Sequence, residues 1–358
     1  MLAEIMAVYL LLVLVFAMNP LRRMFLPLQM DKNIYFFAGK RIEYFDFLKG
    51  VAIIAVIIVH ISYLSLILFK GEGSLFLFEL NNLTRFAIPF FLIISGILST
   101  LKYNQKMDLK KYYFGKFFKL YLPFAFFTIL VVFLHDKDIS NLPSYLVNGL
   151  ALTPYYFVIL ILQLYILFPL LRHLKDSRFF LFFSFVVSLI FFTFNDLNTI
   201  NGVILFPKFL FFFVYGMYYR NNFMNYKVNK SHIKYWYFIV FMYIFVTLIL
   251  PDHYFNFRPF FGIAIFNLFF IYKKQIIAQF DDLYNFLINV GKNSIWIYFT
   301  HFSLLAGLFY LLGLFLNNLY VTVLIVFVVS LPLSFLIGSI FSKIYSNILN
   351  TLYGAKNK

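Results

Sequence analysis

The sequence predicts an all-α, polytopic membrane protein with about eleven transmembrane helices. Of its 358 residues, 63% are hydrophobic and 12% are charged, whereas about 25% of the residues of an ordinary globular domain are charged. Several stretches of 17 residues or more contain one charge or none, and a helix of about that length crosses a hydrocarbon core roughly 30 Å thick. Short segments of alternating hydrophobicity, which are typical of membrane β-barrels, are absent.

The positive charges follow the positive-inside rule. The predicted spans are 3–19, 47–69, 84–101, 117–134, 154–171, 178–193, 203–219, 235–250, 259–272, 294–316 and 319–341. With the N-terminus outside and the C-terminus in the cytoplasm, the cytoplasmic loops hold 24 of the 30 Lys and Arg residues, and the opposite loops hold three. Basic residues accumulate on the cytoplasmic side of membrane proteins. The net charge of +16 is therefore a topology signal, and no nucleic-acid partner is predicted.

The ends of the chain and its cysteine content narrow the class further. Arg22-Arg23 follow the first span and no basic residue precedes it, which is opposite to the pattern of a secretory signal peptide. We therefore expect a retained helix. The chain contains no cysteine, which excludes disulfides, thiolate metal ligands and a cysteine nucleophile.

The second predicted span contains Lys49 and His60, and Asp46 directly precedes it. Lys49 and His60 are eleven residues apart, so a helix places them on one face about 16 Å apart, with Asp46 within about 40° of that face. Asp46 and Lys49 fit an interfacial ion pair, and His60 fits a hydrogen bond to a neighbouring helix. Ionisable groups at membrane depth usually mark function, however, and a neutral imidazole is a candidate general base. A proton-coupled transporter fits His60 equally well.

Two further segments carry polar residues. Arg85 stands at the outer end of the span 84–101 and suits an interfacial anchor or an anion ligand, whereas the pair Ser95-Gly96 favours close helix packing. Gly291 and Asn293-Ser294 predict a turn and an N-cap before the span that contains His301.

The other charged residues have simpler explanations. His135, His173, His232 and His253 fall in predicted loops and are expected to be solvated. Two intramembrane histidines without a nearby carboxylate make a poor metal site, so none is predicted. The basic run from Lys102 to Lys119 is explained by the positive-inside rule, although it also suits a phosphorylated ligand.

Five segments, in order, resemble motifs of the acyltransferase-3 family of bacterial integral membrane proteins, which O-acylate surface glycans and related hydroxyl acceptors. Residues 46–60 resemble its "D-x-x-R-G-hydrophobic-H" opening, and 85–96 resemble "R-x-x-x-P-x-F-F-x-x-S-G". Residues 155–171, 206–219 and 293–301 are similar to its Leu-Tyr-Pro segment, its Gly-Met span and its late "S-x-x-I-Y-x-x-H".

The resemblance implies a domain organisation and a reaction. Residues 1–40 would form an additional transmembrane helix and a cytoplasmic linker, 41–345 the ten-helix acyltransferase-3-like domain, and 346–358 a cytoplasmic tail. The implied reaction moves an acyl group, acetyl above all, from cytoplasmic acyl-CoA to a hydroxyl of a cell-surface or lipid-linked glycan. The expected location is the cytoplasmic membrane, acyl-CoA is a co-substrate, and no tightly bound cofactor is implied.

The resemblance also assigns roles to residues. His60, Lys49 and Arg85 match its catalytic positions, and the two cations would also contact the donor. Asp46, Ser95, Tyr298 and His301 match supporting positions. Lys49 departs from the usual arginine and keeps the charge but loses the bidentate fork.

Two alternatives stay open at this stage. In a glycan-lipid flippase or a proton-coupled transporter, His60 and Arg85 would line a pathway. A family relative without catalysis would serve as a membrane subunit.

Overall fold

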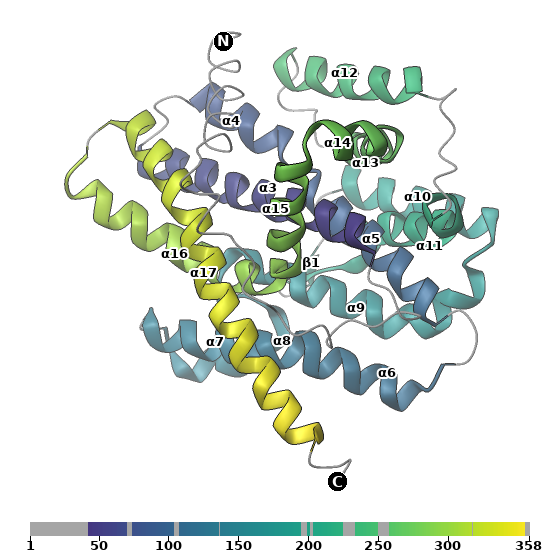
Figure 1. Cartoon of the computed structure of the whole chain (residues 1–358), viewed down its shortest axis with the longest axis horizontal. Coiled ribbons are helices and arrows are strands. Elements are labelled where there is room, and N and C mark those ends of the chain that lie inside the picture. Colours follow the sequence, from purple (N-terminus) through teal and green to yellow (C-terminus); the bar gives the residue numbers. More distant parts are fainter. Residues whose placement is uncertain are drawn as a thin grey trace. The chain divides into compact units, whose positions relative to one another are not determined.

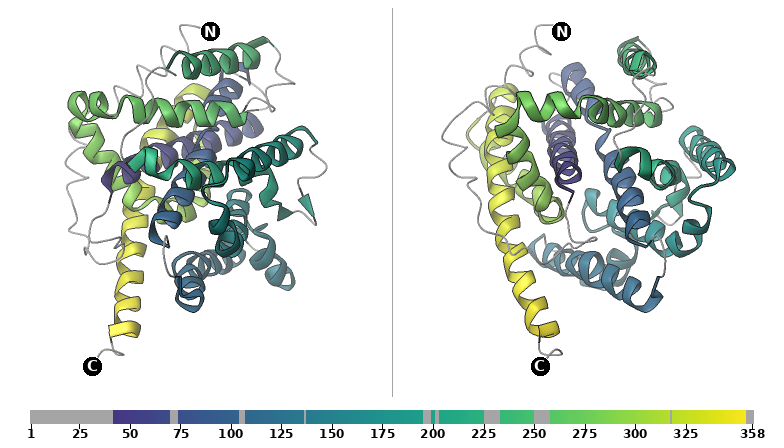
Figure 2. Two further views of the ribbon diagram at one scale, coloured as in Figure 1. Left: turned by 90° about the vertical axis from the view of Figure 1, so that its right-hand side faces the viewer. Right: turned by 45° about the vertical axis from the view of Figure 1, so that its right-hand side comes forward.

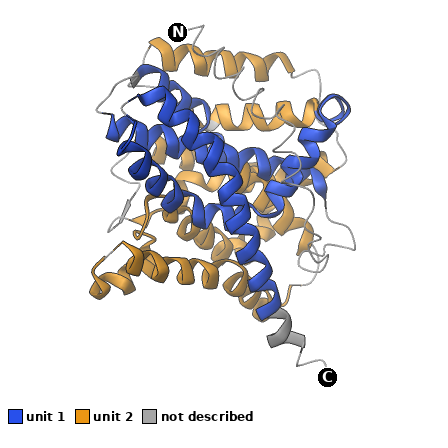
Figure 3. Cartoon of the chain, turned by 60° about the vertical axis from the view of Figure 1, so that its left-hand side comes forward, with its two compact units in different colours: residues 1–87, 273–358 blue, residues 88–272 orange. Residues whose placement is uncertain are grey.

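The computed structural model describes residues 42–69, 74–103, 107–135, 137–194, 199–200, 203–224, 233–249, 258–316 and 318–354 (Figure 1). The predicted first span 3–19, His232 and His253 lie outside these residues. The contacts divide the chain into two compact units, 1–87 with 273–358 and 88–272 (Figure 3). Each unit is described by itself below.

The first unit consists of helices in its described part. They are α3 (Glu43–Leu68), α4 (Ser74–Leu83), α14 (Lys273–Gln279), α15 (Asp281–Lys292), α16 (Ser294–Gly313) and α17 (Leu319–Gly354). In Figure 2, α17 runs as one long helix toward the C-terminus, past the predicted end of its span at residue 341.

The second unit is also mainly helical. Its α-helices are α5 (Ala87–Lys102), α6 (Leu109–Lys116), α7 (Leu122–Leu134), α8 (Leu142–Asn148), α9 (Tyr156–Leu171), α10 (Arg178–Thr193), α11 (Leu210–Met224), α12 (Ile233–Ile249) and α13 (Arg258–Ile271). A π-helical segment, η1 (Phe117–Tyr121), joins α6 to α7. Short 3₁₀ turns cover Ile139–Asn141, Thr153–Tyr155, Arg172–Leu174 and Phe206–Phe209, and β1 (Thr199–Ile200) pairs antiparallel with β2 (Val203–Ile204).

The prediction of an all-α, multi-pass membrane protein is confirmed. Six helical segments of the described chain are long and apolar enough to cross a membrane: Glu43–Leu68, Leu75–Lys102, Leu109–Leu134, Ile139–Leu174, Ser294–Gly313 and Leu319–Ile348. The bent pair Phe260–Ile271 and Lys273–Gln279 gives a seventh if it is one span. The predicted spans 178–193, 203–219 and 235–250 fall on α10, α11 and α12, which have 16, 15 and 17 residues. The count of eleven stays a prediction.

Helix α3 is the centre of the first unit. It contacts α4, α15, α16 and α17, and its buried residues surround the helix, from Tyr44 to Ser65. A helix that is apolar on all sides is typically buried among others. This position explains why the segment carries few polar residues. It also means that these few are surrounded by protein.

Backbone contact joins α3 to α15. A Cβ atom on Gly50 would collide with the carbonyl oxygen of Leu287, and one on Gly291 would collide with the carbonyl oxygen of Asp46. Glycine permits such an approach because it has no side chain. The two helices therefore meet at two reciprocal glycine positions.

The structure of this region corrects two sequence predictions. The segment 273–293, predicted as a cytoplasmic loop, forms α14 and α15, and Gly291 lies inside α15 instead of at a turn. The positions Tyr284, Leu287, Ile288 and Gly291 are all buried, and their spacing of i, i+3, i+4 and i+7 is that of an amphipathic helix. The charges at both ends of the segment obscured this pattern.

The second unit uses the same device between α5 and α11. A Cβ atom on Gly96 would collide with the carbonyl oxygen of Phe213, and one on Gly216 would collide with that of Ile93. This is the close packing that the Ser95-Gly96 pair predicts.

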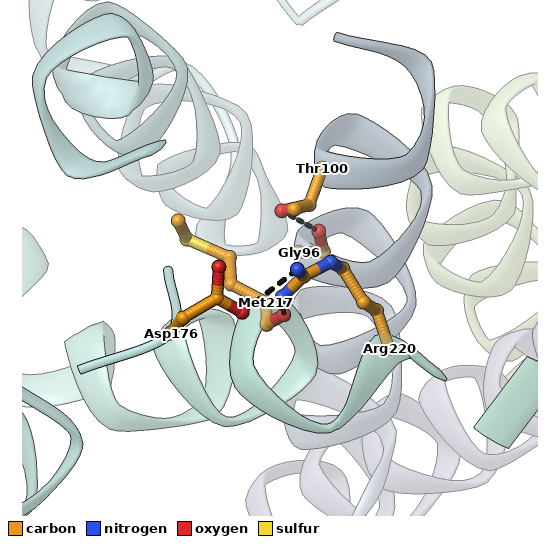
Figure 4. Close-up of polar contacts among 5 residues, drawn as sticks. All are labelled: Gly96, Thr100, Asp176, Met217 and Arg220. Atoms are coloured by element: carbon orange, nitrogen blue, oxygen red, sulfur yellow. Dashed lines mark hydrogen bonds and ion pairs between the residues drawn. The ribbon is translucent and has the colours of Figure 1, made fainter. Parts of the chain in front are cut away.

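Each helix of this pair also has polar contacts of its own. Thr100 Oγ1 donates a hydrogen bond to the Gly96 carbonyl at 2.8 Å (Figure 4). Arg220, which is only 6% exposed, donates to the Met217 carbonyl at 2.8 Å and pairs with the Asp176 carboxylate at 2.8 Å. A buried charge needs such partners, and the arginine is therefore a structural element of this unit.

We predict that the glycine contact is a main source of stability in the first unit. Gly50→Ala and Gly291→Ala should each lower the free energy of unfolding by about 1–3 kcal/mol because of overpacking. The matched control is Gly307→Ala in α16, where a Cβ atom would meet nothing within 4 Å. Thermal unfolding of the detergent-solubilised protein measures the difference, and equal midpoints for all three variants would contradict the packing argument.

Candidate functional site

Two histidines far apart in the sequence lie side by side in the first unit. His60 on α3 and His301 on α16 have ring centroids 5.2 Å apart, and the Phe302 ring is nearly perpendicular to the His60 ring, with the two centroids also 5.2 Å apart. His301 is fully buried, while His60 is half-buried. The structure thus brings together the catalytic candidate and a supporting candidate from opposite ends of the chain.

The backbone fixes the orientation of His301. Its Nδ1 atom lies 2.7 Å from the Tyr298 carbonyl oxygen and 3.2 Å from that of Ile297. Because a carbonyl oxygen only accepts hydrogen bonds, Nδ1 carries the proton. The neutral ring therefore presents a lone pair at Nε2. That atom is buried and has no hydrogen-bond partner in the described part of the chain.

His60 also has an unused ring nitrogen. Its Nδ1 atom is buried and no described residue hydrogen-bonds to it. Buried polar atoms nearly always have partners, and exceptions often lie at functional sites. Two such nitrogens on adjacent imidazole rings form a place where a proton can be accepted and passed on.

Arg85 is linked to the turn of α3 that carries His60. It lies in the turn between α4 and α5, and its Nε and Nη2 atoms donate to the side-chain oxygen of Asn81 at 2.9 and 2.5 Å. The Asn81 amide nitrogen in turn donates to the Val59 carbonyl at 2.9 Å and to Ser62 Oγ at 3.1 Å. Asn81 therefore ties the guanidinium to the residues that flank His60.

The sequence interpretation missed this link. It placed residues 70–83 in an external loop, whereas 74–83 form α4. The polar pair Asn81-Asn82, one turn before Arg85 and within an apolar stretch, was the available signal. Glu79, a carboxylate that is only 5% exposed, lies on the same helix and was also missed.

Asp46 and Lys49 form the predicted ion pair near the start of α3. Lys49 Nζ lies 3.4 Å from Asp46 Oδ1, and the side chains are 24% and 3% exposed, respectively. The helix is continuous from this pair to His60, as the eleven-residue spacing predicts. The two sites are therefore separated by about 16 Å along α3, and Lys49 does not contact the imidazoles.

The remaining candidates have different positions. Tyr298 is buried, and it supports His301 through its carbonyl oxygen, with its ring 5.7 Å away. Ser95 lies on α5 in the second unit, whose placement relative to the histidines is not described. The break before α16 falls at Asn293 as predicted, but this side chain does not cap the helix; it donates to the Asn289 carbonyl at 3.2 Å. No group of three metal-binding side chains occurs among the residues described.

The fold and the site define a polytopic membrane protein with a histidine pair and a fixed arginine among its helices. A family model described as an acyltransferase domain, acyltransferase-3, matches residues 42–339. The chain therefore belongs to the acyltransferase-3 family, and the resemblance found in its motifs is confirmed. No curated protein and no solved structure gives a significant match.

We predict that Asn81 stabilises the first unit through Arg85. Asn81→Ala leaves a half-buried guanidinium without its acceptor and should lower the free energy of unfolding by about 1–3 kcal/mol. Asn285→Ala is the matched control, because Asn285 is exposed on α15 and, among the described residues, hydrogen-bonds to the Asp281 carboxylate. Denaturant unfolding of the two variants measures the effect. Equal losses of unfolding free energy in the two variants would show that the hydrogen bonds of Asn81 add no specific stability.

Proposed function

We propose that this protein is an O-acyltransferase of the cytoplasmic membrane. It moves an acyl group, acetyl in the first instance, from cytoplasmic acyl-CoA to a hydroxyl of a cell-surface or lipid-linked glycan. Family membership supports acyl transfer in general. The observation that carries the proposal further is the pair of adjacent imidazole rings of His60 and His301, each of which has a buried nitrogen without a described hydrogen-bond partner.

In this mechanism His60 acts as the general base. It takes the proton of the acceptor hydroxyl while the oxygen attacks the thioester carbonyl, so that a C–O bond forms. The tetrahedral intermediate then collapses, the C–S bond breaks, and the proton returns to the leaving CoA thiolate. In a covalent variant, a ring nitrogen of His60 attacks the thioester carbonyl, an N–C bond forms, and the C–S bond breaks to release the CoA thiolate. The acceptor hydroxyl then attacks the acyl-imidazole, the N–C bond breaks as the C–O bond forms, and the hydroxyl proton goes to the thiolate, so the overall reaction is the same.

The neighbouring residues have roles that follow from their contacts. His301 lies beside His60 with its Nε2 lone pair oriented by the backbone, and it shares the proton with His60. Arg85, which Asn81 holds in place, stabilises the developing oxyanion or a phosphate of a substrate. Lys49 is a donor-side cation, and Asp46 fixes its ammonium group near the start of α3.

We predict that both histidines of this pair are needed for acylation. His60→Ala and His301→Ala should each lower the O-acyl content of the surface glycan at least 100-fold, which is the usual size of a general acid–base contribution of roughly 10²–10⁴. His173→Ala, which changes an exposed histidine, should leave it unchanged. The measurement is NMR of the glycan before and after mild alkali, in a deletion strain complemented with each variant at equal membrane abundance.

The outcomes separate the classes of function. Loss of the alkali-labile signal with intact glycan export supports catalysis at the histidine pair. Unchanged acylation with stalled export would make the protein a flippase or transporter. If the deletion strain itself keeps full acylation and export, the protein is not the acyltransferase of this glycan.

A further inference from the structure

One neutral side chain contacts both the cation of the candidate site and the helix turn that carries its base. Asn81, near the end of α4, accepts hydrogen bonds from Arg85 through its oxygen and donates to α3 through its nitrogen. A guanidinium group only donates and a carbonyl oxygen only accepts, so these partners settle which end of the amide faces which helix. The amide is buried, and its orientation is therefore fixed.

On the α3 side, the amide holds the residues around His60. It donates to the Val59 carbonyl at 2.9 Å and to Ser62 Oγ at 3.1 Å, and this hydroxyl donates in turn to the Ile58 carbonyl at 2.9 Å. Val59 directly precedes His60, and Ser62 follows it by two residues. The turn that carries the imidazole is thus tied to Asn81 on both sides of the histidine.

On the other side, the guanidinium keeps its charge and part of its capacity to donate. Its Nε and Nη2 atoms donate to the Asn81 oxygen, and no carboxylate pairs with Arg85 in the described part of the chain. The N–H groups that Asn81 does not use are left for a substrate oxygen. Arg85 is also close enough to His60 for the two groups to interact electrostatically.

The buried arginine of the second unit has a different kind of partner. Arg220 pairs with the Asp176 carboxylate at 2.8 Å, which offsets its charge and suits its structural role. A carboxylate at position 81 would hold Arg85 at least as strongly, because hydrogen bonds between ionised groups are the stronger ones. A neutral amide instead fixes the guanidinium without cancelling the positive charge that stabilises an oxyanion.

Helix packing alone does not account for these contacts. Asparagine side chains often join membrane helices by hydrogen bonds, and the bond from Asn81 to the Val59 carbonyl is enough for that purpose. The same amide also binds Arg85. It thereby connects the two groups that the proposed reaction needs close to each other.

We propose that Asn81 is a positioning residue of the acyl-transfer reaction. It sets the place of the Arg85 guanidinium relative to the His60 imidazole and leaves the positive charge intact for the oxyanion of the transition state. This inference rests on the proposed function, in which those two groups contact the substrate. Asn81 acts through them, and a misplacement of about 1 Å in such a pair lowers a rate roughly 100-fold.

The test measures kcat and KM separately. Purified protein in vesicles is supplied with acetyl-CoA and the isolated host glycan, and acetyl transfer is measured per folded protein at a temperature below all unfolding midpoints. Asn81→Ala should lower kcat about 100-fold. It should leave the KM for acetyl-CoA unchanged, because the oxyanion forms only in the transition state. A raised KM with wild-type kcat would overturn the inference.

Asn81→Asp separates the neutral amide from the hydrogen bond to Arg85. The carboxylate still accepts from the guanidinium, but it offsets the positive charge and has no hydrogen to donate to the Val59 carbonyl. We expect a kcat that is at least about tenfold below that of wild type. Wild-type kcat in this variant would overturn the inference, because a purely structural anchor works with a carboxylate as well.

Thr84→Ala is the matched control for disturbance of the same turn. Thr84 is buried, and it donates to the Leu80 and Asn81 carbonyl oxygens at 2.8 and 3.1 Å, so its described hydrogen bonds reach neither Arg85 nor α3. This variant should keep wild-type kcat. Equal losses of kcat in Thr84→Ala and Asn81→Ala would overturn the inference, and this comparison also serves if Asn81→Asp does not fold.

The result for wild type distinguishes this inference from the proposed function. If wild type acetylates the glycan and Asn81→Ala does so with the same kcat, the inference falls and the proposed function stands. If wild type neither consumes acetyl-CoA nor acetylates the glycan, the proposed function falls and the inference falls with it.

Discussion

The backbone contact between α3 and α15 is the constraint on which the first unit depends. There is no room for a Cβ atom at Gly50 or at Gly291. This close backbone contact fixes the register of the two helices. Because a single residue, Asn293, separates α15 from α16, this register also limits where His301 can lie along α3. The glycine of the opening motif and the glycine before the last motif thus act together, although 240 residues of chain separate them.

The candidate site adds two kinds of fixation to that scaffold. Backbone carbonyl oxygens fix the tautomer of His301, and Asn81 fixes Arg85 to the turn of α3 that carries His60. Neither interaction uses a flexible charged partner. Groups held in this way lose little free energy to reorganisation when charge develops in a transition state. The geometry is therefore suited to acyl transfer, and its polar atoms lie among packed helices.

The sequence predicts a large part of this arrangement, and its failures have definite causes. Long apolar runs predict the membrane class and the continuous α3, and residue spacing predicts the Asp46–Lys49 pair. Each of these features depends on residues that are close together in the sequence. Three features escaped: α4, α15 and the role of Asn81. The first two are helices whose apolar pattern is broken by polar residues. The hydrogen bonds of Asn81 join α4 to α3, and no spacing within one helix reveals such contacts. The supporting role of Ser95 stays a prediction.

One measurement tests the central claim, that the protein itself transfers an acyl group from acyl-CoA to a glycan hydroxyl. Purified protein reconstituted in vesicles would be supplied with acetyl-labelled acetyl-CoA and the isolated host glycan. We expect free CoA thiol to be released in a one-to-one ratio with alkali-labile label on the glycan. Movement of the glycan across the vesicle membrane without consumption of acetyl-CoA would contradict the claim and identify a transporter.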